Sequence, residues 1–281
     1  MRPRPVPSRL VERLRVPVPS GVLGAWLVRL RDGRDPAQAR FLTSSSLRWV
    51  VRHRAVTPWY LVRYARLLRL RIRSPHVVLR GMVFLGRGVE LSARPGYGRL
   101  EIGRWVHLGD HTRLRAHEGT LRVGDKCVVG RETTVNCYLD VEIGAGTLVS
   151  DWVYIGDFDH ATADVHRPIK DQGIVKSPVR VGPGSWLGVK ASVLRGTWIG
   201  RGSVVAAHTV ARGRYPDLAV IAGVPGRVVR DRQQQYDAEA EHRAALADMQ
   251  HRHRRVAEQV AADETPDQPA DRPADPSSTD R

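Results

Sequence analysis

Residues 179–205 read VRVGPGSWLGVKASVLRGTWIGRGSVV, and an aliphatic residue returns in this stretch at every sixth position. Glycine directly follows several of these residues, as in VG, LG and IG. A period of six fits neither the 3.6-residue repeat of an α-helix nor the two-residue alternation of a β-strand. A chain that winds through three short strands per turn gives this period, because each strand turns one aliphatic side chain inward. The stretch therefore predicts a mainly β protein, a parallel β-helix of hexapeptide repeats. Its inward positions are Val181, Leu187, Val193, Ile199 and Val205.

Shorter series upstream extend the predicted β-helix over residues 76–229. The period then breaks once on a large scale, because the hexad due at residue 161 arrives only at residue 181. The sequence IGDFDH (155–160) opens this break, so residues 157–178 are predicted to form an extended loop outside the coil. The upstream series are Ile102, Leu108 and Leu114; Val123, Val129 and Val135; and Ile143, Val149 and Ile155.

The first 75 residues carry most of the positive charge. They hold 17 Arg, no Lys and three acidic residues, whereas the net charge of all 281 residues is +16. Residues 1–40 are rich in Pro and Arg and are expected to form a disordered arm, and residues 41–75 a basic amphipathic helical segment. A block of this kind suits phosphates or an anionic membrane surface. Nucleic acid is a weaker partner, because aromatic residues suited to base stacking are few in this segment.

Within the helical segment, Thr57 and Pro58 have the pattern of an N-cap and a first helical residue. The residues that follow recur at helical spacing on two sides. Two interpretations stay open: the apolar side packs on the end of the β-helix as a cap, or it lies in a membrane interface. The two are compatible. The basic side holds Arg63, Arg66, Arg69 and Arg73, and the apolar side holds Leu61, Ala65, Leu68 and Ile72.

The remaining features indicate the cellular compartment and the structure of the C-terminal residues. Cys127 and Cys137 match neither a disulfide framework nor a zinc spacing, which fits a reducing cytosol. No apolar run reaches the roughly 18 residues of a membrane span, and the N-terminus lacks the apolar core of a signal peptide. We therefore expect a cytoplasmic protein, with peripheral contact at the inner face of the membrane as an extension. Residues 230–260 are predicted to form a closing helix, and the Asp- and Pro-rich residues 261–281 a disordered tail.

Three stretches carry a resemblance to a known family. VEIGAGTLVSDWVYIGDFDH (141–160) resembles a family segment in which a hexad precedes a catalytic histidine on an extended loop. Residues 179–207 resemble its V-x-I-G-x-x-x-W-I-G repeats, and VIAGVPGRVVR (220–230) resembles its terminal AGxPAxxIR motif, with Gly226 where alanine is usual. The chain thus resembles the left-handed β-helix acyltransferases of the hexapeptide-repeat family, most closely the sugar O-acetyltransferases of the maltose and galactoside type.

That resemblance implies transfer of an acyl group, usually acetyl, from coenzyme A to a hydroxyl or amine. It also implies a homotrimer with the active site between neighbouring subunits, no permanently bound cofactor and no metal. Attack of a hydroxyl on a thioester needs a base, and imidazole suits that task near neutral pH. His160, at the break in the period, is the predicted general base. His166, six residues further on, has two open interpretations, a substrate contact and a surface residue.

The family match also indicates residues that contact the acceptor. Asn136 and Asp140 resemble the family's substrate-contacting region, and an alternative for Asn136 is a corner residue of the coil. Asp157 and Asp159 are further candidates for acceptor binding. They either orient His160 or shape the turn that begins the loop.

For the donor, Trp186 matches a tryptophan beside the pantetheine arm, with packing between coils as the alternative. Ala207 matches a small residue that lets the pantetheine lie close to the coil. Arg227 and Arg230 match basic positions near the adenosine phosphates, where guanidinium groups suit phosphate oxygens.

Two other functions use the same kind of coil. A metal-dependent carbonic anhydrase needs three histidines that meet between subunits, and a scaffold protein would act only through its basic arm. The predicted function is an acyl-CoA-dependent O-acetyltransferase whose acceptor is a sugar or glycan precursor, including one linked to a lipid. The histidines available for a metal are His107, His111, His117, His160 and His166.

Overall fold

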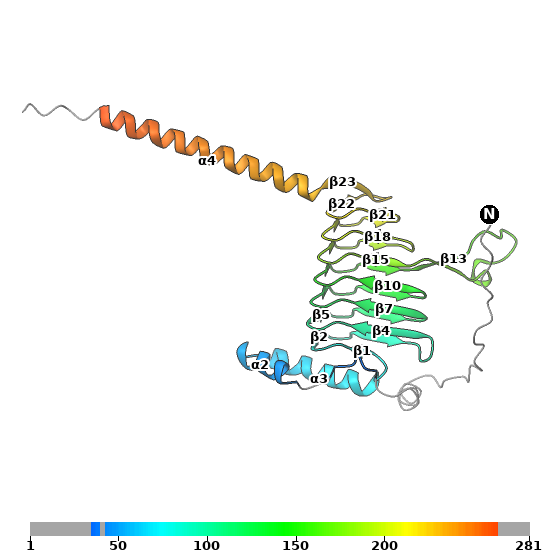
Figure 1. The fold of residues 1–281 in the computed structure, drawn as a ribbon. Helices are drawn as coiled ribbons and strands as arrows, with labels where there is room; N and C mark the ends of the chain where they lie inside the picture. Colours follow the sequence, from blue (N-terminus) through cyan, green and yellow to red (C-terminus); the bar gives the residue numbers. More distant parts are fainter. Residues whose placement is uncertain (1–34, 40–42, 264–281) are drawn as a thin grey trace, which may run out of the picture. The chain divides into compact units, whose positions relative to one another are not determined.

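The computed structural model describes residues 35–39 and 43–263, and these contain a parallel β-helix (Figure 1). Strands of successive turns pair in parallel register and build three sheets, so the β-helix has three faces. We call one complete turn a coil. The prediction of a mainly β chain wound from hexapeptide repeats is confirmed. The expectations for residues 1–34 and 264–281 lie outside the described residues.

The three faces take their strands in rotation along the chain. The first face contains β1 (Val78–Leu79), β4 (Gly98–Ile102), β7 (Gly119–Val123), β10 (Asp140–Ile143), β15 (Val179–Val181), β18 (Trp198–Ile199) and β21 (Arg214–Tyr215). The second face contains β2 (Val83–Leu85), β5 (Val106–Leu108), β8 (Val128–Val129), β11 (Leu148–Val149), β16 (Trp186–Leu187), β19 (Val204–Val205), β22 (Ala219–Ala222) and β23 (Arg227–Asp231). The third face contains β3 (Glu90–Ala93), β6 (Arg113–Ala116), β9 (Thr134–Cys137), β12 (Tyr154–Gly156), β17 (Ser192–Val193) and β20 (Val210–Ala211).

The inward positions of the hexads form one continuous core. Leu187 pairs with Val149 in the coil before it and with Val205 in the coil after it. All three side chains are almost fully removed from solvent. Burial of a Val or Leu side chain contributes about 1.5–3 kcal/mol, so the stack of aliphatic residues supplies most of the stabilisation.

Glycine follows the inward residue because successive coils approach closely at the corners. A Cβ atom on Gly182 would lie 2.5 Å from the Arg201 backbone nitrogen, and one on Gly188 would lie 2.6 Å from the Ala207 nitrogen. Both contacts are with backbone, which cannot move aside without breaking the pairing of the strands. The corner therefore excludes a side chain, which explains the aliphatic–glycine pairs of the sequence.

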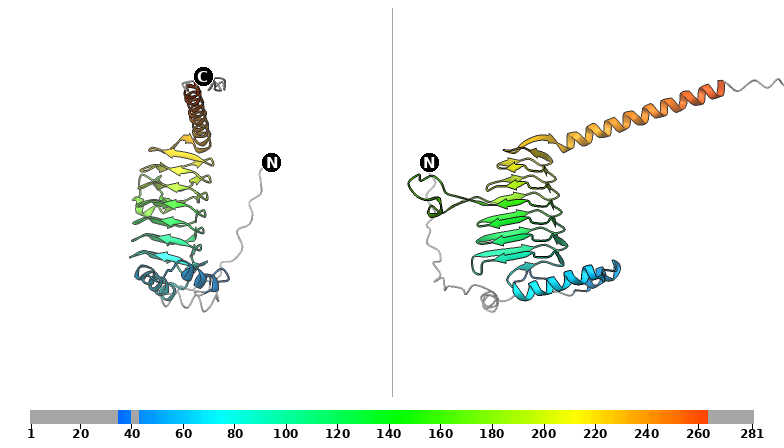
Figure 2. Two further views of the ribbon diagram at one scale, coloured as in Figure 1. Left: turned by 90° about the vertical axis from the view of Figure 1, so that its left-hand side faces the viewer. Right: turned by 180° about the vertical axis from the view of Figure 1, so that it is seen from behind.

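Two helices, α2 (Ser44–Arg52) and α3 (Pro58–Arg73), cover the first coil (Figure 2). Their contacts with the coil are both aromatic and polar. The Trp49 ring centroid lies 5.5 Å from that of Phe84, and Arg66 Nη1 donates a hydrogen bond to the Leu85 carbonyl at 3.1 Å. Thr57 does occupy the N-cap position of α3, although its hydroxyl makes no capping hydrogen bond. The segment therefore caps the β-helix.

The capping face of α3 differs from the one that the sequence predicts. Leu67 is buried in the core, whereas Leu61, Leu68 and Ile72 of the predicted apolar side are exposed. The expectation that this apolar side packs on the coil is therefore wrong. The physical reason is that Leu67 lies on the other side of the helix, where it joins the aliphatic core of the coil.

The C-terminal helix α4 (Arg232–Asp263) follows β23, and its residues from Gln233 onward form a unit separate from the β-helix. It begins two residues later than predicted and continues through residues 261–263, which were expected to belong to the disordered tail. None of the helices in the described part of the chain is long and apolar enough to cross a membrane.

Leu187→Ala is expected to lower the stability of the β-helix by about 2–5 kcal/mol, because it removes buried methyl groups and leaves a cavity. The thermal unfolding midpoint measures the loss. Leu246→Ala, at a partly exposed position of α4, is the matched control and should leave that midpoint almost unchanged. Equal shifts for the two variants would contradict the assignment of Leu187 to the core.

Candidate active site

A hairpin arm leaves the coil where the third face turns into the first (Figure 1). It departs after β12, forms β13 (Phe158–His160), the short 3-10 helix η1 (Ile169–Asp171) and β14 (Ile174–Lys176), and rejoins the coil at β15. Strands β13 and β14 pair antiparallel, with His160 opposite Ile174. The predicted break in the period thus corresponds to an antiparallel hairpin outside the parallel coil.

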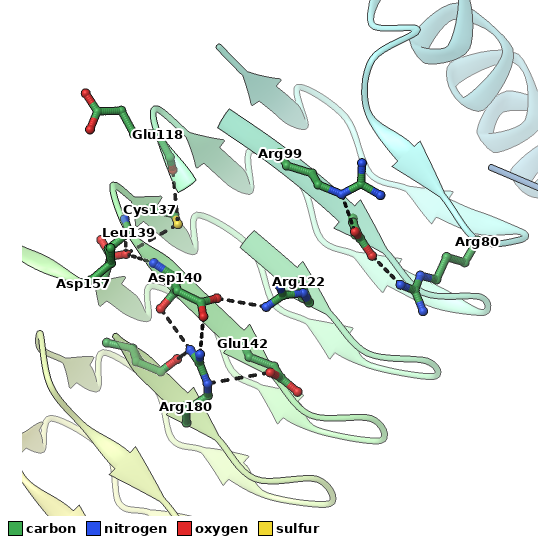
Figure 3. A network of polar contacts seen from close by, with 12 residues as sticks. Arg80, Arg99, Glu118, Arg122, Cys137, Leu139, Asp140, Glu142, Asp157 and Arg180 are labelled. Atoms are coloured by element: carbon green, nitrogen blue, oxygen red, sulfur yellow. Dashed lines mark hydrogen bonds and ion pairs between the residues drawn. The ribbon is translucent and has the colours of Figure 1, made fainter. Parts of the chain in front are cut away.

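The root of the arm is held by Asp157, whose side chain is fully buried (Figure 3). Its carboxylate accepts hydrogen bonds from the backbone N–H groups of Tyr138, Leu139 and Asp140 at 2.7–2.8 Å. The Cys137 thiol lies 3.5 Å from the same carboxylate. Burial, followed by the Asp157 charge, raises the pKa of this thiol well above its usual range. Asp157 therefore shapes the turn, which favours the second interpretation of this residue.

Asp159 is directed to a neighbouring coil. Its Oδ2 atom lies 2.5 Å from Arg195 Nε, on the loop between β17 and β18. A second ion pair joins Lys176 of the arm to Glu118. The arm is thus tied to the coils on both sides of its root, and Asp159 acts in that attachment.

His160 is exposed at the end of β13, where its ring continues a row of aromatic side chains. The ring centroids of His117 and Tyr138 are 4.7 Å apart, those of Tyr138 and Phe158 4.4 Å, and those of Phe158 and His160 6.2 Å. Sequence reasoning named His117 only as a possible metal ligand, and it missed Tyr138 and Phe158. Their spacings of 21 and 20 residues, close to one coil, are the signal that could have found them.

Asn136 lies on the third face beside the start of the arm. It pairs with Gly156, the residue before Asp157, and its side chain contacts the Tyr154 hydroxyl. Burial raises the pKa of Tyr154, while the hydrogen bond with Asn136 acts in the opposite direction. The Asn136 Oδ1 atom is buried and has no hydrogen-bond partner in the described part of the chain. A buried acceptor without a donor is costly.

Asp140 lies just past the same corner, on the first face (Figure 3). Its Oδ1 atom accepts a hydrogen bond from Arg122 Nη1 at 3.0 Å, and its Oδ2 atom pairs with Arg180. Arg180 also approaches Glu142 at 3.7 Å. The guanidinium groups of Arg122 and Arg180 therefore neutralise the charge of Asp140. Their hydrogen bonds also fix the position of its carboxylate.

The predicted donor residues lie elsewhere on the coil. Trp186 is on the second face, where its Nε1 atom donates a hydrogen bond to Ser150 at 3.0 Å. Ala207 is exposed in the corner between the second and third faces, and Arg227 and Arg230 are exposed on β23. The edge that carries His160 is opposite the second face. One chain therefore brings the predicted acceptor residues together but separates them from the predicted donor residues.

The histidines show no metal-binding arrangement. In residues 35–39 and 43–263, no group of three or more His, Cys, Asp or Glu side chains could hold a metal ion. His107 stacks on Phe84 with ring centroids 4.4 Å apart, and burial lowers its pKa. His166 is exposed on the arm, where its backbone N–H bonds to Asp164.

The sequence resemblance implies this architecture for an acyltransferase: a three-faced β-helix with an exposed histidine on a projecting hairpin. Comparison with known proteins gives the same family. A protein of Mycobacterium tuberculosis named as a probable acetyltransferase, Rv3034c, is 59% identical over 214 residues, 76% of this chain and 71% of the relative. WbbJ of Escherichia coli, named as an O-acetyltransferase of lipopolysaccharide biosynthesis, is 33% identical over 141 residues, 47% of this chain and 72% of its own. The chain therefore belongs to the acetyltransferases of the hexapeptide-repeat type.

A solved structure agrees on the fold. AntD, an N-acyltransferase from Bacillus cereus determined with dTDP and 3-hydroxybutyryl-CoA, has a TM-score of 0.51 and 16% identity, and covers 65% of this chain and 96% of its own. No protein-family model matches the chain. The predicted class, an acyltransferase enzyme, is confirmed by the family, which sets aside the scaffold alternative.

Asp157→Ala is expected to loosen the arm, because three backbone N–H groups at its root lose their acceptor, at a cost of about 1–3 kcal/mol. Trypsin cleavage after the exposed Lys170 should then become about tenfold faster, as the opened state is more populated. Asp164→Ala, which removes a similar hydrogen bond on the exposed arm, is the control. Unchanged cleavage in Asp157→Ala would contradict the anchoring role.

Proposed function

We propose that this enzyme transfers an acetyl group from acetyl-coenzyme A to a hydroxyl group of a sugar or glycan precursor. The observation that carries the proposal is the edge where β12 ends. The exposed His160 ends the first strand of the arm, four residues after Gly156, and Gly156 pairs with Asn136, whose buried Oδ1 atom lacks a partner among the described residues. A base and an unsatisfied acceptor at one edge suit a substrate that presents several hydroxyl groups. WbbJ, named as an O-acetyltransferase of lipopolysaccharide biosynthesis, supports the same acceptor class.

The chemistry requires a single proton acceptor. His160 takes the proton of the acceptor hydroxyl while its oxygen attacks the thioester carbonyl. The tetrahedral intermediate then collapses, the carbon–sulfur bond breaks, and the proton passes to the departing thiolate of coenzyme A. Asn136 and Asp140 orient the acceptor in this scheme, and Asp157 and Asp159 hold the arm that carries the base.

The separation of the two residue sets supports a homotrimer. Trp186, Ala207, Arg227 and Arg230 would bind the pantetheine and the phosphates of coenzyme A, yet they lie away from the edge that carries His160. A neighbouring copy can place its second face against that edge, so each complete site would use residues of two subunits. The enzyme would work in the cytoplasm, on an acceptor that is free or linked to a lipid at the inner face of the membrane.

His160→Ala is expected to lower kcat by about 10²–10⁴-fold, the usual contribution of a positioned general base. Release of free thiol from acetyl-coenzyme A in the presence of a panel of sugars measures the rate. His166→Ala, which changes an exposed histidine on the same arm, should keep most of the activity. Full activity of His160→Ala would rule out the proposed mechanism, whereas activity lost equally in both variants would indicate damage to the arm.

Mixed oligomers test whether two subunits share each site. We expect His160→Ala and Trp186→Ala chains to be weakly active alone and to regain activity when refolded or expressed together. Random assembly pairs an intact His160 edge with an intact Trp186 face in about a quarter of the sites, so the mixture should reach about a quarter of the wild-type rate. A mixture no more active than the average of its parts would contradict a shared site.

A further inference from the structure

The outward side of α3 carries a row of exposed apolar side chains. Leu61, Leu68 and Ile72 are 53%, 49% and 55% exposed, and they recur at spacings of seven and four residues, on one side of the helix. Leu67, on the opposite side, is buried against the coil. The coil therefore fixes which side of α3 faces outward, and that side is apolar.

Two arginines lie between this apolar row and the coil. Arg69 and Arg73 line a groove of about 500 Å³ between α3 and the first coil, together with Arg66. Arg66 donates to the Leu85 carbonyl, whereas neither Arg69 nor Arg73 has a hydrogen-bond or ion-pair partner among the residues that the structure describes. Within the described part of the chain, no acidic side chain neutralises either guanidinium group.

Glu90 is the one acidic residue among the described residues that line the groove, and it does not compete for these cations. Glu90 accepts two hydrogen bonds from Arg115, each 2.8 Å long, and these bonds lower its pKa. Its charge is thus committed to Arg115 on the third face. The groove keeps a net positive charge beside an exposed apolar row.

We propose that α3 docks the protein on an anionic phospholipid bilayer. Leu61, Leu68 and Ile72 enter the interface between headgroups and acyl chains, while Arg69 and Arg73 bind lipid phosphates. An amphipathic helix whose apolar row is flanked by arginines is suited to this position, because apolar burial and attraction to anionic lipid add together. The many arginines of the first 75 residues supply further charge of the same sign.

The charges also argue against a second copy of the chain as the partner that covers the outward side of α3. Two copies related by a two-fold axis through α3 would bring Arg69 and Arg73 close to their own equivalents, and like charges across an interface are costly. A bilayer that contains anionic lipid offers the complementary sign. The inference is independent of the proposed reaction, since it uses no residue of the candidate active site.

Flotation of the full chain with lipid vesicles tests the proposal. We expect the protein to bind vesicles of phosphatidylcholine and phosphatidylglycerol, and to bind pure phosphatidylcholine vesicles much more weakly. The triple variant Leu61→Gln, Leu68→Gln, Ile72→Gln should lower the partition coefficient by about tenfold or more, as loss of apolar insertion predicts. Arg69→Gln with Arg73→Gln should lower it by about tenfold or more, at roughly 1 kcal/mol per arginine.

Matched controls separate the α3 surface from general effects. Arg131→Gln with Arg201→Gln removes the same charge from exposed corners of the coil, and Leu246→Gln with Met249→Gln removes exposed apolar side chains from α4. Each control pair should change binding by less than about twofold. Unchanged circular dichroism and thermal midpoint will show that the α3 variants are folded. Inorganic phosphate, added as a competitor, distinguishes a free-phosphate site from a lipid surface.

Three results would overturn the proposal. The first is that the triple apolar variant binds vesicles as strongly as the wild type at each salt concentration, low and high. The apolar row would then contribute nothing, and binding would be assigned to charge alone. The second is suppression of vesicle binding by millimolar inorganic phosphate with no effect of the apolar substitutions, which would indicate a free-phosphate site. The third is a changed oligomeric state of the triple variant in sedimentation velocity without a change in vesicle binding, which would assign the surface to contact between copies.

Discussion

The structure depends on the close parallel stacking of coils whose strands are too short to exist alone. Many strands contain only two or three residues, and most of these bury at least one aliphatic side chain. Such a strand is stable only when the coils before and after it supply both its hydrogen-bond partners and the neighbours of its buried side chain. The corners must therefore be tight, which is why a Cβ atom on Gly182 would meet the backbone of the next coil.

A departure from this stack needs its own attachment, and the arm has one. Residues that leave the coil lose their parallel partners, so the backbone N–H groups of the adjacent corner need another acceptor. The buried carboxylate of Asp157 supplies it, and the ion pair of Asp159 with Arg195 ties the arm to a later coil. These contacts leave His160 exposed on a supported hairpin. The proposed base, held in this way, can reach beyond the coil and still keep a defined position.

The end of a parallel stack presents unpaired strand edges and exposed core residues, and α2 and α3 cover those of the first coil. Covering the coil uses one side of α3, through Leu67, and the aromatic contacts of Trp49. The other side of α3 therefore faces outward, and its apolar residues are exposed. One constraint, closure of the coil end, thus also determines which surface the protein offers to its surroundings.

The sequence by itself determined the fold, because a six-residue period admits few other structures, and it located His160, because the histidine stands where that period breaks. It also indicated Asn136, but not the unpaired Oδ1 atom. Only the tertiary structure showed that Asp157 is a buried anchor, since that depends on three N–H groups from another coil. Only the tertiary structure showed that Leu67 is buried, whereas Leu61, Leu68 and Ile72 are exposed. Helical spacing defines the sides of a helix, but which side is buried depends on contacts with residues distant in the sequence.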